Sequence, residues 1–92
     1  MARASARHIL VKTREEAEKL KQRLEKGEDF AVLAKKYSLC PSKKQGGDLG
    51  EFGPGQMVKA FDDVVFKKAL LTIHGPVKTR FGFHLIQTLY RS

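Results

Sequence analysis

The chain has 92 residues, of which 41% are hydrophobic and 30% charged, and its excess of Lys and Arg gives a net charge of +8. This composition excludes an intrinsically disordered chain, and the length allows one domain with a small core, which we expect to span residues 1–92. No apolar run approaches a membrane span or a signal peptide, and the single cysteine excludes an internal disulfide. We therefore expect a soluble, cytoplasmic protein, and a monomer.

The first part of the chain predicts one strand followed by two helices. Residues 6–12 are apolar and β-branched up to a charge, which is typical of a short strand. Residues 13–27 form a helical pattern that begins with a capping box at Thr13 and ends at Gly27. A second helical pattern covers residues 28–38.

The rest of the chain predicts two strand regions around a third helix. Residues 39–47 are rich in turn formers, and residues 48–52 can form a short strand. A third helix is expected over residues 59–70, and residues 75–92 resemble a β-hairpin with Gly82 at its turn. The order strand-helix-helix-strand-helix-strand-strand predicts an α+β domain with a small, mostly antiparallel sheet and helices around it.

Cys40, the only cysteine, invites three interpretations. As a nucleophile it would need a nearby base and an oxyanion hole, but the residues around it match no known thiol-enzyme signature. As a metal ligand it would need partners at short spacings, and no two of the His and Cys residues have such spacings. A small, half-buried thiol is the commoner situation.

The glycines that follow Cys40 have neither the P-loop spacing nor the dinucleotide-binding fingerprint, and turn geometry explains them.

His8 and His84 each lie within an otherwise apolar strand pattern, one near each end of the chain. A single histidine in such a strand is usually a core residue with its hydrogen bonds satisfied. Two of them on the first and last strands could meet if those strands pair, which periodicity alone does not show.

Four blocks of sequence occur in a recognisable order: RHILVK, FAVLAKKYSLCPS, GGDLGEFGPGQMVKAFDDVVF and GPVKTRFGFHLI. Together they resemble the parvulin-type peptidyl-prolyl cis/trans isomerases, and most of all the small stand-alone parvulins of the bacterial cytosol. The resemblance covers essentially the whole chain. It implies a four-stranded antiparallel sheet surrounded by helices, in agreement with the predicted order of elements.

The resemblance also implies roles for nine side chains. Those expected to form the paired histidines and the hydrogen-bonded catalytic network are His8, His84, Cys40 and Thr79. Those expected to bind the substrate are Leu49, Met57, Phe61, Phe52 and, at the rim of the final turn, Phe81. Cys40 would act noncovalently, because some parvulins carry Asp at this position.

The implied activity is rotation about X-Pro bonds in unfolded or flexible polypeptides, which assists protein folding and needs no cofactor or metal. Phosphate-directed parvulins carry a basic loop after the first strand. Here Lys12 and Arg14 are followed at once by the acidic helical turn of Glu15 and Glu16, so we expect an apolar or unselective residue before proline.

Two other functions are weighed against catalysis. One is a noncatalytic peptide-binding or chaperone module, as some parvulin domains in larger proteins are. The other is nucleic-acid binding driven by the net charge of +8, which is less favoured because the cations are scattered along the chain.

Overall fold

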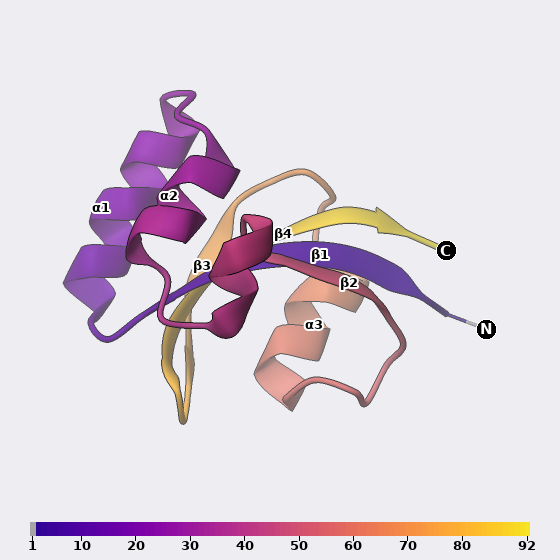
Figure 1. The fold of residues 1–92 in the computed structure, drawn as a ribbon. Helices are drawn as coiled ribbons and strands as arrows, with labels where there is room; N and C mark the ends of the chain where they lie inside the picture. Colours follow the sequence, from indigo (N-terminus) through magenta and orange to yellow (C-terminus); the bar gives the residue numbers. More distant parts are fainter. Residues whose placement is uncertain (1) are drawn as a thin grey trace.

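The computed structural model describes residues 2–92, which form one four-stranded sheet with helices packed against it (Figure 1). The elements in chain order are β1 (Ala4–Val11), α1 (Arg14–Glu25), α2 (Phe30–Tyr37), the 3₁₀ helix η1 (Pro41–Gln45), β2 (Asp48–Phe52), α3 (Lys59–Lys67), β3 (His74–Thr79) and β4 (Gly82–Arg91). The strands are antiparallel in the order β2-β1-β4-β3. The predicted α+β class and order of elements are confirmed. Within the described residues the structure adds one element, the helix η1, in a segment predicted only as turns.

Local signals in the sequence define the ends of the first two helices. The Thr13 hydroxyl accepts the Glu16 backbone N–H at 3.2 Å, and the Asp29 carboxylate accepts the Val32 N–H at 3.1 Å. Both are N-caps that satisfy a helix-end donor.

None of the helices within residues 2–92 combines the length and the apolarity that crossing a membrane requires.

The third helix ends three residues earlier than predicted. Carbonyl groups at this end accept hydrogen bonds from a residue far along the chain. The Arg91 guanidinium donates to the carbonyls of Val65 and Lys68 at 2.8 and 2.9 Å. Lys68 lies outside α3, and its side chain is exposed.

The sheet is covered on both faces. Adjacent residues of a strand point to opposite faces, and Leu85 and Ile86 of β4 are both fully buried. Leu85 belongs to the cluster under α1 and α2, whereas Ile86 belongs to the cluster under α3. We call these two sides the α1/α2 face and the α3 face. His8 and His84 lie on the α3 face, since each is two residues in sequence from a member of that cluster, Ala6 and Ile86 respectively.

The segment between α2 and β2 is held against β1. The Ser38 hydroxyl accepts the Leu10 N–H at 3.1 Å, and the Gly47 carbonyl accepts the His8 N–H at 3.0 Å. Gly47 has a φ of 88°, and a Cβ at this position would lie 2.5 Å from the His8 carbonyl oxygen. Only glycine allows this approach, which brings Cys40 and η1 beside the first histidine strand.

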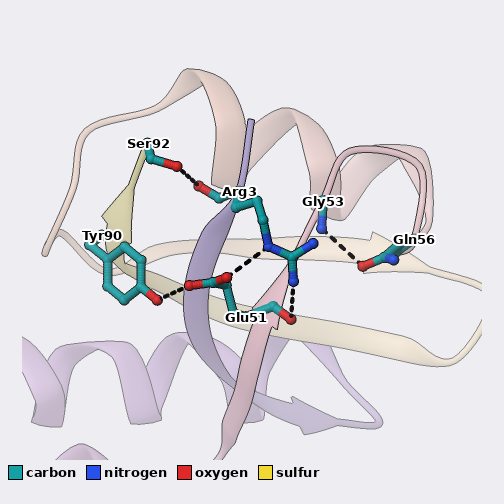
Figure 2. Close-up of polar contacts among 6 residues, drawn as sticks. All are labelled: Arg3, Glu51, Gly53, Gln56, Tyr90 and Ser92. Carbon is teal, nitrogen blue, oxygen red and sulfur yellow. Dashed lines mark hydrogen bonds and ion pairs between the residues drawn. The ribbon is translucent and has the colours of Figure 1, made fainter. Parts of the chain in front are cut away.

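A polar cluster joins the two ends of the chain to β2 (Figure 2). Arg3 Nε lies 2.7 Å from Glu51 Oε1, and the Tyr90 hydroxyl donates to the same carboxylate. The Ser92 N–H donates to the Arg3 carbonyl at 2.8 Å. These contacts tie β2, β1 and β4 together at the end of the sheet opposite the β3–β4 turn, close to where β2 leads into the loop before α3 (Figure 2).

Candidate functional site

A pocket of about 400 Å³ opens on the α3 face of the sheet. Strands, η1, a loop and α3 all contribute to its wall, which consists of His8, Leu10, Leu39, Cys40, Pro41, Leu49, Met57, Val58, Phe61, Phe81 and His84. Among residues 2–92, no carboxylate, ammonium or guanidinium group lines it. The wall therefore suits an uncharged, largely apolar group.

Seven of the nine predicted site residues meet in this pocket: His8, Cys40, Leu49, Met57, Phe61, Phe81 and His84. Thr79 lies behind the wall, where it contacts His84. Phe52 was expected to form part of the wall and does not line the pocket; only 3% of its surface is exposed. Its ring packs behind Phe61, with the two ring centroids 6.2 Å apart.

Four lining residues are not among the nine predicted site residues: Leu10, Leu39, Pro41 and Val58. A signal for Leu10 was available, because it is two residues after His8 in a strand and so shares its face. Leu39 and Pro41 flank Cys40, and their place depends on how η1 packs against β1.

The two strand histidines meet at the floor of the pocket. His8 Nδ1 lies 3.0 Å from His84 Nδ1, and both side chains are 5% exposed. Thr79 Oγ1 lies 2.7 Å from His84 Nε2 and accepts the Phe81 N–H at 3.1 Å. The result is a polar chain from His8 through His84 and Thr79 to the final hairpin turn.

The number of available protons limits the protonation states of this hydrogen-bonded series of side chains. One Nδ1 must donate to the other, so the pair holds one shared proton at this contact. His8 Nε2 is buried and has no hydrogen-bond partner within residues 2–92. It is the one ring nitrogen of the pair that makes no hydrogen bond among these residues.

Both rings are neutral near pH 7. Burial, and secondarily the charge of His84, lowers the pKa of His8 from 6.5 to about 4. Burial also lowers the pKa of His84. Phe61 adds an apolar lid, since its ring meets those of His8 and His84 edge-on at centroid distances of 5.5 and 5.9 Å.

Cys40 forms part of the wall without joining the polar chain. Its side chain is half-buried, and the hydrogen bonds found within residues 2–92 include none to its thiol. Its backbone N–H instead donates to the Ser38 hydroxyl at 3.3 Å. The expected network therefore contains both histidines and Thr79, whereas the expected hydrogen bond of Cys40 is not found. The side chains of residues 2–92 also include no group of three His, Cys, Asp or Glu that could hold a metal ion.

Two hydrogen bonds from side chains fix the loop between β2 and α3, which places Met57 in the wall of the pocket. The Asp62 carboxylate accepts the Gly55 N–H at 2.6 Å, and the Gln56 side-chain oxygen accepts the Gly53 N–H at 2.9 Å, the second of which is drawn in Figure 2. The loop thus closes onto the start of α3, and Met57 and Phe61 face the same pocket.

Comparison with known proteins places this geometry in a family. Residues 1–91 match the family described as the PPIC-type PPIASE domain. The foldase protein PrsA of a Geobacillus species is 54% identical over 83 residues, which are 89% of this chain and 30% of the relative. The chain spans about 30% of the length of the curated relatives of this kind that it matches.

Solved structures agree. The parvulin NmPin of Nitrosopumilus maritimus superposes with a TM-score of 0.87 at 37% identity, and 98% of each chain is covered. The peptidylprolyl isomerase PrsA of Bacillus anthracis superposes with a TM-score of 0.95 at 36% identity, over 99% of this chain and 42% of the other. The chain belongs to the parvulin family of peptidyl-prolyl cis–trans isomerases, as a PPIC-type domain.

Proposed function

We propose that this chain accelerates rotation about X-Pro peptide bonds without forming a covalent intermediate, with the proline ring seated in the pocket between β1, β4 and α3. The observation that carries the proposal is the combination of an apolar pocket with a buried, neutral histidine pair at its floor. Flexible or unfolded polypeptides that contain proline are the substrates.

The energetic task is small. Amide resonance creates a rotation barrier of about 18–20 kcal/mol, and the uncatalysed isomerisation of X-Pro bonds takes tens to hundreds of seconds. Turnover on the order of 100 per second would need the barrier lowered by roughly 5–6 kcal/mol, at about 1.4 kcal/mol per decade. Neither a nucleophile nor an acid–base pair is required for an effect of this size.

The apolar wall supplies one part of that effect. Leu49 and Met57 face the pocket and are half-buried, and Phe61 provides a flat wall above the histidines. A pocket that grips the proline ring, while the chain on either side is held, can bind the twisted amide better than either planar form. Only binding that is stronger in the twisted state accelerates the rotation.

The polar floor supplies the other part. As the amide twists, its nitrogen becomes pyramidal and its lone pair is no longer shared with the carbonyl. Polar groups fixed in a place without water stabilise such a change in charge distribution more than water does. The His8–His84–Thr79 chain is fixed in this way by hydrogen bonds of 3.0 and 2.7 Å. The principal role of the histidine pair and Thr79 is to keep the polar groups at the floor of the pocket in fixed positions. Cys40 contributes a polarisable side chain to the wall.

The rim favours an apolar or unselective residue before proline. Only Lys12 and Thr13 lie between β1 and α1, so there is no long basic loop that could surround a phosphate. Leu39, Val58 and Phe81 line the pocket and are 52%, 37% and 57% exposed, which leaves apolar surface for residues that flank the proline. We also retain three predictions from the sequence: the protein is cytoplasmic, it is a monomer, and it works as one domain.

Exchange NMR on a short Ala-Leu-Pro-Phe peptide tests the proposal. We expect the chain to catalyse cis/trans exchange, and the double variant Met57→Ala, Phe61→Ala to lose the catalysis. Phe66→Ala is the matched control, because Phe66 is also an α3 phenylalanine in the same cluster but does not line the pocket. Binding of the peptide without catalysed exchange would instead indicate a noncatalytic peptide-binding module.

A further inference from the structure

The pocket has no charged group of its own, but one lies directly beside it on the β3–β4 turn. The Cζ atom of Arg80 lies 4.9 Å from the centroid of the Phe81 ring. Phe81 is a wall residue that is 57% exposed, so the guanidinium lies beside the rim of the pocket. Such stacking on an aromatic ring leaves the donors at the edge of a guanidinium open to other groups.

Arg80 is a cation without an acidic partner in the part of the chain that the structure describes. The ion pairs among residues 2–92 join Arg3 to Glu51, Lys19 to Glu15, Arg23 to Glu28 and Lys67 to Asp63. The side chain of Arg80 is exposed. Its charge is therefore available to a molecule that enters the pocket.

The turn that carries Arg80 is anchored. The Thr79 hydroxyl accepts the Phe81 N–H at 3.1 Å and also contacts His84, which fixes the turn to the floor of the pocket. Gly82, with a φ of 140°, packs so closely that a Cβ there would lie 2.4 Å from the Val11 carbonyl oxygen. The backbone of Arg80 thus has a defined position relative to the proline-binding wall, although its side chain reaches into solvent.

We propose that Arg80 determines substrate specificity by favouring polypeptides in which an acidic residue lies within two positions of the proline. This inference rests on the proposed function, because it assumes that proline occupies the pocket. An extended chain advances about 3.3 Å per residue. A carboxylate two residues from the proline therefore lies about 7 Å away, a separation that a long side chain beside the pocket rim can span. The arginine fork matches a carboxylate in geometry as well as in charge.

The size of the preference follows from its exposure. An ion pair at a surface changes binding by about two- to five-fold and is weakened by salt. This is a bias among substrates rather than an absolute requirement, and it is compatible with an apolar residue directly before proline.

The test uses two pairs of blocked peptides that differ only in Glu against Gln. One pair is Glu-Leu-Pro-Phe and Gln-Leu-Pro-Phe, and the other is Leu-Pro-Phe-Glu and Leu-Pro-Phe-Gln. The quantity measured is the ratio of kcat/KM for the acidic peptide to kcat/KM for the neutral one, by exchange NMR at low ionic strength. Because this ratio is internal to each protein sample, it does not depend on how much of a variant is folded.

Arg14→Gln is the matched control for Arg80→Gln. The Cζ atom of Arg14 lies 5.2 Å from the centroid of the Phe83 ring, so it too is an exposed guanidinium stacked on a phenylalanine of this hairpin. Phe83 packs against the core of the α1/α2 face, on the side of the sheet away from the pocket. Both variants remove one positive charge, but only Arg80→Gln removes it from the pocket rim.

We expect a ratio of about two to five for at least one pair, a ratio near one in Arg80→Gln, and the parent ratio in Arg14→Gln. About 0.5 M NaCl should reduce the parent ratio toward one. Ratios near one for both pairs in the parent chain would overturn the inference, as would a ratio that survives Arg80→Gln or that Arg14→Gln removes equally. If none of the four peptides showed catalysed exchange, the proposed function itself would be overturned, and the inference with it.

Discussion

His8 and His84 are 76 positions apart in sequence, yet their Nδ1 atoms lie 3.0 Å apart at the centre of the sheet. The contact is created by the pairing of β1 with β4, in which Leu10 is opposite His84 and His8 is opposite Ile86. The histidines are therefore diagonal neighbours on one face of an antiparallel pair, a position from which long or aromatic side chains can reach each other. Since burial keeps both rings neutral, they can exchange a hydrogen bond without repulsion between charges.

Removal of one ring should cost both stability and activity. In His84→Ala the buried Nδ1 of His8 loses its partner, and the hydroxyl of Thr79 loses one of its two contacts. We expect the free energy of unfolding to fall by about 1–3 kcal/mol, the usual cost of an unpaired buried polar group, and turnover to fall with it. Thermal unfolding and exchange NMR would measure the two effects.

The control for this variant is His74→Ala. His74 lies on β3, does not line the pocket, and contacts the Ala69 carbonyl through Nε2 at 2.8 Å. We expect a smaller loss of activity from this change. If His84→Ala left both the melting temperature and turnover unchanged, the idea of a structural histidine network would fail.

The buried histidines should make folding stability depend on pH. The pKa of His8 is about 4 in the folded chain against 6.5 for an unperturbed histidine. Between these values the unfolded chain binds more protons than the folded one, so stability rises with pH. The stability is fully present above about pH 6.5 and is lost as the pH falls toward 4, with a total of about 3 kcal/mol for a shift of this size.

Urea unfolding at intervals between pH 4.5 and 7 would measure this slope. The carboxyl groups of Glu28 and Glu51 have lowered pKa values because of their hydrogen bonds to Arg23, and to Tyr90 and Arg3, respectively. Their contribution is present above 4.5, the ordinary value for Glu, and is lost below it, so it falls outside this window. A His8→Phe variant should show a flatter profile; an unchanged profile would mean that other groups are responsible.

Cys40→Asp should keep measurable isomerase activity. The thiol lines the pocket but makes no hydrogen bond to a histidine within residues 2–92, as an activated nucleophile would. Mass spectrometry of the parent chain with a proline peptide should accordingly detect no covalent adduct. A Cys40→Asp variant that is correctly folded but inactive would revive the nucleophilic mechanism.

Gly47→Ala should destabilise the chain more than Gly50→Ala does. Both glycines have a left-handed φ, 88° and 72°, so alanine is strained at each, at a cost of about 1 kcal/mol. At Gly47 the new Cβ would also meet the His8 carbonyl oxygen at 2.5 Å, whereas at Gly50 nothing lies within 4 Å. We expect a further loss of about 1–3 kcal/mol for Gly47→Ala, measured by urea unfolding. Equal losses would show that η1 and β2 can move away from β1 at little cost.

Much of the fold could be predicted because the signals for it are local. The N-caps at Thr13 and Asp29 depend on residues within three positions, and helical periodicity predicted where the three helices lie. The end of α3 was predicted too late. The carbonyls at this end of the helix accept hydrogen bonds from Arg91, which lies on the distant strand β4. No pattern within the helix itself could reveal that contact.

The candidate site divides in the same way. By itself, the sequence determined the order of elements, the absence of charged groups among the expected site residues, and, through its resemblance to a family, a set of nine expected site residues, seven of which line the pocket. Only the tertiary structure decided that the His8 and His84 rings meet, that Phe52 lies behind Phe61, and that the Cys40 thiol forms no hydrogen bond with them. The reason is physical: capping and periodicity act within a few residues, whereas strand register and side-chain packing join residues far apart in the chain, and their geometry exists only after the sheet has formed.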